Sequence, residues 1–375
     1  MKLSDFDYHL PKSLIAQKPS QPRDRSRLLV VDRETKKIQH KHFYDLPKFL
    51  RTGDVLVFND TKVFPARLRV SKKPTGGRLE IFLLRPVKGP VWECLIGGKV
   101  RRVGQEFVLS DKDIKRSRNE ELEGEIIEEK GKGIWLVRFN KSGHGFWHAV
   151  NKYGQTPTPP YIKTPDSKTK QKQYQTVYAN KVGSVAAPTA GFHFTKKLIK
   201  KLKDSGIKIE FVTLHVGYGT FQPVKETNIK KHKMHAEWAS ISPATLKRLR
   251  KAKKDGRRII AVGTTSVRVL ETIYSTGTRR ALARRSQVEA RASTYSRQDL
   301  AGWIDTFIYP SWKFKAIDGM ITNFHLPQSS LLMLVAAFMG MKMKKQGITF
   351  TKDIYKKAVN KKYRFYSFGD GMLIK

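Results

Sequence analysis

Residues 184–194 read SVAAPTAGFHF, and we expect the rest of the chain to be organised around this stretch. Small residues and one proline fill most of it, and His193 then stands between two phenylalanines. The run has neither a helical nor a strand period, so it predicts a loop whose backbone can approach a ligand closely. Residues 209–221, IEFVTLHVGYGTF, predict a strand that ends at a glycine-rich turn. His215 is therefore expected at a strand end, in a candidate site with His193.

Histidines recur in this half of the chain. A lone histidine is more often structural than reactive, and a Gly-x-Gly turn is a weak signal by itself. Five of the ten histidines, however, lie in or near short segments that contain Gly, Thr, Asn or Pro: His193, His215, His232, His235 and His325. Because histidine exchanges protons near neutral pH, this recurrence favours an active site built from the second half of the sequence.

The charge balance predicts a polyanionic partner. The 375 residues include 74 Lys plus Arg against 32 Asp plus Glu, a formal net charge of +42. Nucleic acid is the first candidate, because it can neutralise this charge. A uniformly basic surface without such a partner is the alternative, since the basic residues are spread along the chain. Hydrophobic residues at 39% and aromatic residues at 10% exclude a disordered chain.

Cysteine and hydropathy patterns predict a protein of the reducing cytoplasm. Cys94 is the single cysteine, so a disulfide framework and a thiolate metal cluster are both excluded. The amino-terminal residues lack the apolar run of a secretion signal. The longest apolar stretch, residues 331–341, is too short for a bilayer and is expected to form a buried helix.

Two sequence patterns divide the chain into domains. Residues 66–155 contain short alternating runs separated by Gly and Lys, a pattern that predicts an inserted antiparallel barrel or sandwich. Residues 1–65 begin with polar turns and two strands, and from residue 174 onward strands alternate with helices. We therefore expect an α/β main domain, formed by residues 1–65 and 156–375, that the all-β segment interrupts.

Two helices have clear start signals in the main domain. Thr195 can cap a helix that ends near Gly206, and Ser242 followed by Pro243 is a second start. The second helix carries a row of basic residues, so it is a candidate RNA-binding surface, although a solvated face is the ordinary explanation of a charged helix. The candidate RNA contacts are Lys247, Arg250 and Lys254.

The turn after the strand at 258–262 has the features of an anion site. It reads Gly263-Thr264-Thr265-Ser266, and Arg268 follows in the first turn of a helix. Backbone amides at a helix amino terminus can bind a carboxylate or a phosphate. An ordinary Thr or Ser cap is the alternative. The spacing matches neither a Walker loop nor a dinucleotide fingerprint.

Other segments carry weaker signals. Asn59 and Asp60 follow a strand, where they could form a simple turn or contact a ligand. Pro327 predicts a helix start, whose positive end would keep His325 neutral. Residues 276–300 are rich in Arg, Ser and Thr, and we expect a mobile loop there.

Several long blocks of this sequence resemble the S-adenosylmethionine:tRNA ribosyltransferase-isomerase family of queuosine biosynthesis. The blocks cover nearly the whole chain in order: residues 59–68, 174–194, 213–224, 232–238, 262–268, 307–310, 322–332 and 363–372. Ser311 stands where glycine would be expected in this family. The resemblance implies an α/β barrel-like main domain interrupted by an all-β barrel, and no metal.

The resemblance also implies an activity and its partners. The ribosyl group of S-adenosylmethionine, a co-substrate, would be transferred to 7-aminomethyl-7-deazaguanine at the wobble position of tRNA and isomerised. Epoxyqueuosine would form, while adenine and methionine leave. The expected proton-transfer residues are His193 and His215, with His325 in reserve. The expected substrate contacts are Asn59, Asp60, Arg67, Thr189, Phe192, Tyr218, Phe221, Glu237, Thr264, Thr265, Ser266, Arg268 and Asn323. A monomer is the expected state, without a membrane partner.

Three other classes share some of these features. An S-adenosylmethionine-dependent RNA methyltransferase would use the same partners, but its glycine-rich nucleotide loop is missing after the first strand. A non-enzymatic tRNA-binding protein would explain the charge but not the histidine turns. A metal hydrolase could use His232 and His235, three residues apart on one face of an expected helix, with Glu237.

Overall fold

A computed structural model describes residues 1–99, 101–109, 121–131, 133–163, 167–221, 224, 226–277, 299–340 and 344–375. The side chains of Lys168, Thr220, Phe221, Thr276, Lys344 and Lys345 lie outside this description. The expected loop at 276–300 falls almost wholly outside it, because only its ends at 276–277 and 299–300 are described.

A nine-stranded mixed sheet forms the main domain, in the order β15-β13-β12-β3-β14-β16-β17-β1-β2. The strands are β15 Leu300–Ile304, β13 Glu237–Ile241, β12 Lys208–His215, β3 Val55–Asn59, β14 Ile259–Val262, β16 Gly319–Asn323, β17 Gly371–Ile374, β1 Arg27–Val31 and β2 Ile38–His42. Every residue of β3, β14 and β16 is buried, as expected for central parallel strands that are covered on both faces.

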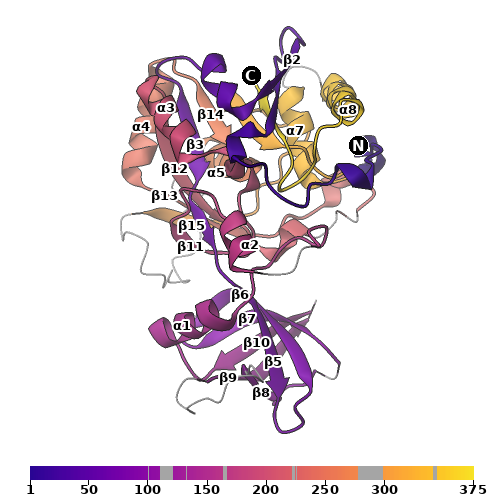
Figure 1. The fold of residues 1–375 in the computed structure, drawn as a ribbon, viewed down its shortest axis with the longest axis vertical. Helices are drawn as coiled ribbons and strands as arrows, with labels where there is room; N and C mark the ends of the chain where they lie inside the picture. Colours follow the sequence, from indigo (N-terminus) through magenta and orange to yellow (C-terminus); the bar gives the residue numbers. More distant parts are fainter. Residues whose placement is uncertain are drawn as a thin grey trace.

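Helices surround this sheet (Figure 1). They are α2 Lys168–Gln173, α3 Lys196–Asp204, α4 Pro243–Lys254, α5 Thr264–Thr276, α7 Ser330–Met339 and α8 Lys344–Asn360. The two predicted caps are confirmed, because the Thr195 hydroxyl accepts from the Leu198 amide at 3.0 Å and the Ser242 hydroxyl from the Thr245 amide at 3.0 Å. Helix α7 is the expected buried apolar helix. None of the described helices is long and apolar enough to cross a membrane.

Two local expectations were wrong. Helix α7 begins at Ser330 rather than at Pro327, because Ser329 is the residue whose hydroxyl accepts from the Leu332 amide. Between Pro327 and Ser330, Gln328 has a φ of 55°, a left-handed conformation that a helix cannot include. The segment around His232 and His235 is not helical: it follows a short 3₁₀ turn at Ile229–Lys231 and leads into β13.

The inserted segment forms a closed antiparallel barrel, in the order β10-β7-β6-β5-β8-β9. Its strands are β5 Arg67–Lys72, β6 Arg78–Lys88, β7 Val91–Gly97, β8 Glu106–Leu109, β9 Leu122–Gly131 and β10 Ile134–Phe139, followed by α1 Gly143–Tyr153. The expected α/β protein with an inserted all-β barrel is thereby confirmed. The barrel hangs below the main domain in Figure 1.

The two parts meet at a narrow junction. The chain enters and leaves the barrel side by side, since Arg67 and Gln155 exchange backbone hydrogen bonds of 3.2 and 2.8 Å. A small parallel pair, β4 Thr61–Val63 with β11 Lys181–Ser184, lies next to this junction. The Tyr218 ring contacts Phe82 of β6 edge to face, with centroids 5.5 Å apart.

Candidate active site at the carboxyl edge of the sheet

Four adjacent parallel strands bring the predicted residues to one edge of the sheet. Strand β12 pairs in parallel with β3, β3 with β14, and β14 with β16, so their carboxyl ends point the same way. These ends carry His215, Asn59, Gly263 and Asn323, in that order. Ligand sites of open α/β sheets lie at this edge. The Tyr218 contact with the barrel shows that the edge faces the inserted domain.

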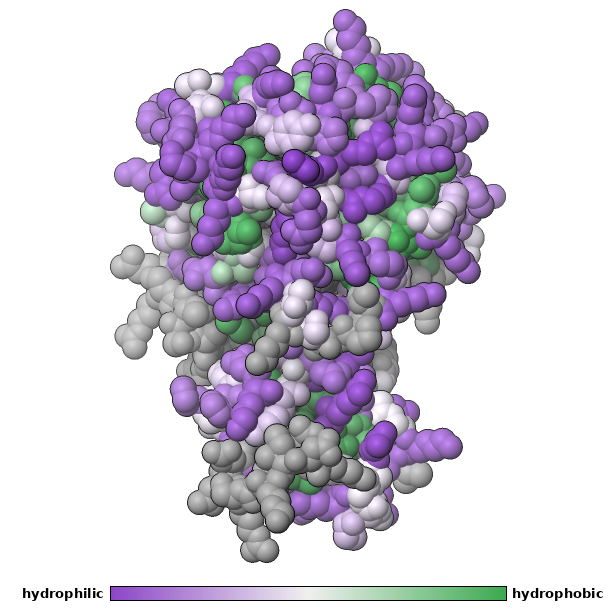
Figure 2. Space-filling model, in the orientation of Figure 1, coloured by the Kyte–Doolittle hydropathy of each residue, from purple (hydrophilic) through white to green (hydrophobic). Residues whose placement is uncertain are grey.

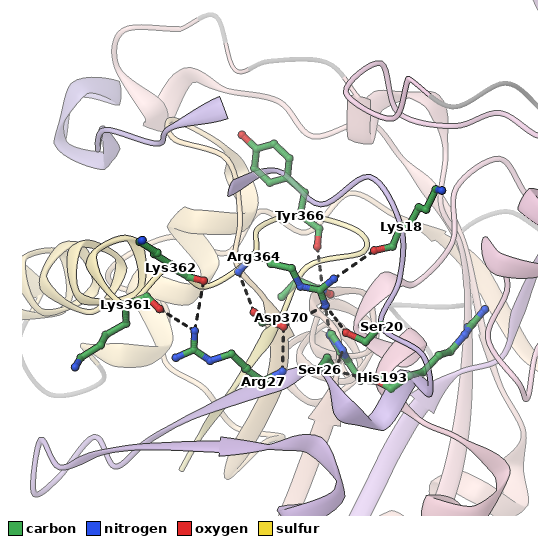
Figure 3. A network of polar contacts seen from close by, with 12 residues as sticks. Lys18, Ser20, Ser26, Arg27, His193, Lys361, Lys362, Arg364, Tyr366 and Asp370 are labelled. Atoms are coloured by element: carbon green, nitrogen blue, oxygen red, sulfur yellow. Dashed lines mark hydrogen bonds and ion pairs between the residues drawn. The ribbon is translucent and has the colours of Figure 1, made fainter. Parts of the chain in front are cut away.

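His193 lies in a saturated hydrogen-bond network (Figure 3). The short 3₁₀ turn Thr189–His193 places it next to β16, where Asn323 Nδ2 lies 3.1 Å from its Nε2. An amide nitrogen can only donate, so Nε2 accepts and the proton of the neutral ring sits on Nδ1. Nδ1 then donates to the Ser26 hydroxyl at 2.7 Å, which donates onward to a backbone carbonyl. Asn323 also accepts from the Thr189 hydroxyl at 3.2 Å.

The surroundings of His193 favour the neutral ring. Only 3% of the residue is exposed, and its ring stacks on Phe43 with centroids 4.0 Å apart. Burial lowers the pKa of His193 to about 3, and the nearby charges of Arg364 and Arg23 act in the same direction. Arg364 is anchored by the buried Asp370, which also accepts from its backbone amide at 2.9 Å. This network ties the loop after α8 to the site (Figure 3).

His215 lies at the end of β12, close to the entrance of the barrel. Its Nδ1 is 2.7 Å from the Thr61 hydroxyl, in β4. On its other side the ring packs so tightly on Gly183 that a Cβ at that position would overlap it. Burial lowers the pKa of His215 to about 3, and Lys181 contributes in the same direction. His215 is half-buried, whereas His193 is buried.

Asn59 and Asp60 form more than a simple turn. The Asn59 side chain exchanges hydrogen bonds of 3.0 and 3.1 Å with the backbone of Leu214, and thus fixes the residue before His215. Asp60 is buried and accepts from the Thr213 hydroxyl at 2.6 Å. Burial raises the pKa of the Asp60 carboxyl, partly offset by that hydrogen bond.

His325 lies on the loop after β16. Its Nε2 is 2.8 Å from the Thr322 hydroxyl, its backbone amide donates to the Tyr355 hydroxyl at 3.1 Å, and its carbonyl accepts from Tyr8 at 2.5 Å. Burial lowers the pKa of His325 to about 3. The neutral form is thus maintained by burial, without the expected helix start at Pro327.

The predicted anion turn begins helix α5. Gly263, with a φ of 87°, precedes the helix and supplies no side-chain cap. Ser266 donates to the carbonyl of Val262 at 2.9 Å, and Thr264 is buried. The buried Thr265 hydroxyl has no hydrogen-bond partner among the described residues. The Thr265 hydroxyl and the backbone amides of the first turn of α5 are therefore the donors that an anion could use here.

Arg268 forms an ion pair that the sequence does not reveal. Its Nη1 donates to Glu237 Oε2, and its Nε donates to the Thr306 carbonyl at 3.2 Å. Glu237 also accepts from the Gly217 amide at 2.8 Å, so the pair connects α5, β13 and the turn after His215. Nη2 of Arg268 is buried and, among the described residues, lacks a partner.

The remaining predicted substrate contacts lie in different environments. Phe192 is buried between Tyr174 and Phe368, where it serves packing. Phe221 ends the 3₁₀ turn Tyr218–Phe221, but its side chain lies outside the described part. Arg67 Nε is 3.5 Å from Glu80 at the start of the barrel.

Helix α4 is separate from this edge. Its basic residues Lys247, Arg250 and Lys254 are all exposed. Figure 1 places α4 at the upper left of the main domain, away from the barrel.

Sequence reasoning missed several partners. Ser26, which is hydrogen-bonded to His193, comes from a remote segment without a motif. Lys181, which lies near His215 and pairs with Asp299 at 2.8 Å, lies within residues 174–194, but a single lysine in that block gives no signal of this role. Thr61 directly follows Asn59-Asp60, so its position at a strand exit was a usable signal. No group of three or more potential metal-ligating side chains occurs among the described residues.

The fold defines the chain as an α/β protein with an inserted antiparallel barrel and a cluster of polar residues at the carboxyl edge of its sheet. A model of the family described as queuosine biosynthesis protein matches residues 3–374, and the chain belongs to this family. The resemblance noted in the sequence blocks is thereby confirmed.

Named relatives cover the whole chain. The S-adenosylmethionine:tRNA ribosyltransferase-isomerase of Sulfurihydrogenibium sp. is 45% identical over 376 residues, with 100% of both chains covered. The protein of the same name from Acetivibrio thermocellus is 46% identical over 378 residues, again with 100% of both covered. The crystal structure of S-adenosylmethionine tRNA ribosyltransferase from Thermotoga maritima is 34% identical, with a TM-score of 0.51, and covers 99% of this chain and 100% of that one.

Proposed function

We propose that this protein is an S-adenosylmethionine:tRNA ribosyltransferase-isomerase. Its substrates would be S-adenosylmethionine and a tRNA with 7-aminomethyl-7-deazaguanine at the wobble position, and its products epoxyqueuosine-tRNA, adenine and methionine. The observation that carries the proposal is the 45–46% identity, over the full length, to relatives of that name. At this similarity the site residues and the inserted barrel are expected to serve the same chemistry.

Proton transfer is assigned to the pair His193 and His215, with His215 as the base that meets the substrate. The reaction needs a base for a carbon acid beside the sulfonium. His215 is half-buried at the barrel entrance, whereas both ring nitrogens of His193 have partners in its neutral form. His193 would then position Asn323, and His325 stays the reserve candidate. A depressed pKa keeps each ring unprotonated at neutral pH.

The methionine carboxylate of S-adenosylmethionine is assigned to the first turn of α5. Support comes from two buried donors that lack partners among the described residues, Thr265 Oγ1 and Arg268 Nη2, at a helix amino terminus. Thr264 and Ser266 complete the turn. The sulfonium, a cation, is expected against the ring of Tyr218 or Phe221, because aromatic faces attract cations without competing hydrogen bonds.

The tRNA is assigned to the basic surface. Figure 2 shows a face that is mostly hydrophilic over both parts of the molecule, with small apolar areas. A net charge of +42 supports binding to phosphate, and α4 is our candidate contact. We further propose that residues 66–155 are a separate unit that contributes to this grip, and that the protein acts as a cytoplasmic monomer.

One incubation tests the proposal. Purified protein is mixed with the modified tRNA and S-adenosylmethionine carrying a labelled methyl group, and free adenine is assayed. We expect adenine release with the label on free methionine. Label on the RNA would indicate a methyltransferase instead, and tRNA binding without adenine release would indicate a binding protein. Heat-denatured protein is the control.

A further inference from the structure

A cavity of about 660 Å³ lies beside the loop that follows β16. Its apolar walls are Tyr8, Leu10, Ile15, Leu326, Pro327 and Tyr366. The volume is in the range of small-molecule and cofactor sites. The aromatic rings in it are not among the groups assigned to S-adenosylmethionine above.

Tyr366 is held in the wall of this cavity at a conformational cost. Its φ of 69° is left-handed, which is uncommon for a bulky residue and often marks a functional position. Its amide donates to the Phe324 carbonyl at 3.2 Å, and its carbonyl accepts from Asn323 Nδ2 at 3.1 Å. The ring lies 4.6 Å from that of Tyr161. The same Asn323 amide holds His193, so the cavity wall and the histidine network share one anchor (Figure 3).

Tyr8 is fixed to the same segment as Tyr366. Its hydroxyl donates to the carbonyl of His325, and its ring packs edge to face on Tyr355, with centroids 5.0 Å apart. Both aromatic walls are thus hydrogen-bonded to residues 323–325, which also carry two of the proposed site residues. A flat group in the cavity would be held at a fixed position relative to the active site.

We propose that this cavity receives an unstacked base of the tRNA anticodon loop, a neighbour of the base that is modified. The inference rests on the proposed tRNA substrate. A base must leave its stack to be modified, and the bases beside it then lose a stacking partner. Aromatic side chains stack with any base, and exposed Lys12 and His9 at the rim complement the adjacent phosphates. Exposed Asp7, also at the rim, can accept from an exocyclic amine.

The openness of the rim favours RNA over the small co-substrate. Asp7, His9, Lys12 and Leu326 are all exposed, so a strand lying on the surface can place one base inside while its backbone stays in solvent. A co-substrate that must be shielded from water during reaction is better served by the edge that faces the barrel.

A binding cycle between protein and RNA variants tests this site. Leu326→Trp fills the cavity from an exposed position, and Tyr44→Trp adds the same ring at an equally exposed position, each parent residue being 44% exposed. Anticodon stem-loop RNAs are made with an abasic nucleotide 5′ or 3′ of the wobble position. We expect one abasic RNA to bind the parent about 5- to 150-fold more weakly, the range for one stacked base.

The cycle separates the possible results. In Leu326→Trp the intact RNA should bind as weakly as the abasic RNA, with no further loss on base removal, while Tyr44→Trp behaves as the parent. The proposal is overturned if base removal lowers the RNA affinity of the parent and of Leu326→Trp by the same factor. It is also overturned if Leu326→Trp raises only the KM for S-adenosylmethionine. Leu10→Trp serves as a second filling variant. Binding is measured without turnover, so failure of the parent to release adenine would count against the proposed function alone.

Discussion

Histidine rings at this site are held neutral by their surroundings. Burial is the main cause for His193, His215 and His325, and the pKa of each falls to about 3. A ring in that state is unprotonated at neutral pH, and it can serve as a base only where its lone pair meets the substrate. Both ring nitrogens of His193 have partners and the residue is buried, whereas His215 is half-buried, so the two members of the proposed pair differ in their access to a substrate.

His215→Ala should lower turnover about 100- to 10,000-fold, the usual contribution of a general base, while S-adenosylmethionine and tRNA still bind. Gly183→Ala should act in the same direction, because a Cβ there displaces the ring. His193→Ala should change binding and turnover together. Single-turnover kinetics and equilibrium binding separate these effects. If both alanine variants stay within a few-fold of the parent, the pair is structural and His325 becomes the candidate.

Protonation of His325 couples stability to pH. The folded pKa of about 3 lies below the unfolded value of about 6.5, so the unfolded chain binds a proton between these values. The stability that the folded chain owes to a neutral His325 is fully present above pH 6.5, and it declines as the pH falls toward 3. Replacement by Asn removes this contribution, so the parent should lose about 2 kcal/mol more than His325→Asn between pH 7 and pH 5. Urea unfolding at both pH values measures it, and parallel losses would contradict it.

Ser311 has a backbone conformation that glycine adopts more easily than serine does. Its φ of 120° lies in the region that favours glycine, which agrees with the expected glycine at this position. Ser311→Gly is therefore compatible with the local backbone.

At the scale of elements, helix α5 is connected to the turn after His215 through the ion pair of Arg268 with Glu237. Arg268 and Glu237 are both buried, and Glu237 holds the Gly217 amide. The pair neutralises charge that would otherwise be costly at this depth. Its remaining donor, Arg268 Nη2, is the part that a substrate carboxylate could use.

Arg268→Ala should raise the KM for S-adenosylmethionine about 10- to over 100-fold, more than that for tRNA, as expected for loss of a charge-assisted hydrogen bond. The single variant also leaves Glu237 unpaired. Arg268→Ala combined with Glu237→Gln removes that unpaired charge and is the control. If the double variant regains the parent KM for S-adenosylmethionine, Arg268 has only a structural role.

If helix α4 contacts the tRNA, its basic residues should contribute to the salt dependence of tRNA binding. Neutralising Lys247, Arg250 and Lys254 to Gln should lower the log-log slope of tRNA binding against salt by about 2, since each phosphate contact contributes roughly 0.7–0.9. The same change at exposed Lys352, Lys356 and Lys357 of α8, on the other side of the main domain in Figure 1, is the comparison, because Tyr355 of this helix packs on Tyr8 in the wall of the proposed base cavity. A slope that falls only with the α8 variant would move the RNA to that face.

At the scale of the whole molecule, the chain enters and leaves the barrel at a narrow junction, but the barrel also packs against the main domain. Val185 is buried in the same apolar cluster as the barrel core, and half-buried Val182 and Tyr218 pack against that cluster. The carboxyl edge of the sheet and the barrel therefore share a surface. Movement of the barrel would act directly on the turn that follows His215.

Replacing residues 67–154 by a short linker should leave a main domain that folds but binds tRNA more weakly. It should also be less stable, because newly exposed Val185 and Phe64 lose about 1.5–3 kcal/mol each of burial. Thermal melts and filter binding measure both. Phe82→Ala in the full chain is the comparison, because it removes the ring contact with Tyr218 together with one buried side chain of the barrel core. A fragment that fails to fold at any temperature would show that the two parts share one core.

The sequence by itself determined the α/β class, the inserted barrel and the capped helices α3 and α4, because these depend on hydrophobic period and on hydrogen bonds that span three residues. It also identified the segments at the carboxyl edge. Only the tertiary structure decided which groups those segments meet: Ser26 with His193, Thr61 with His215, and Glu237 with Arg268. Such partners come from remote parts of the chain, so no local spacing specifies them. The start of α7 shows the same limit, since the left-handed turn at Gln328 overrides the local signal of Pro327.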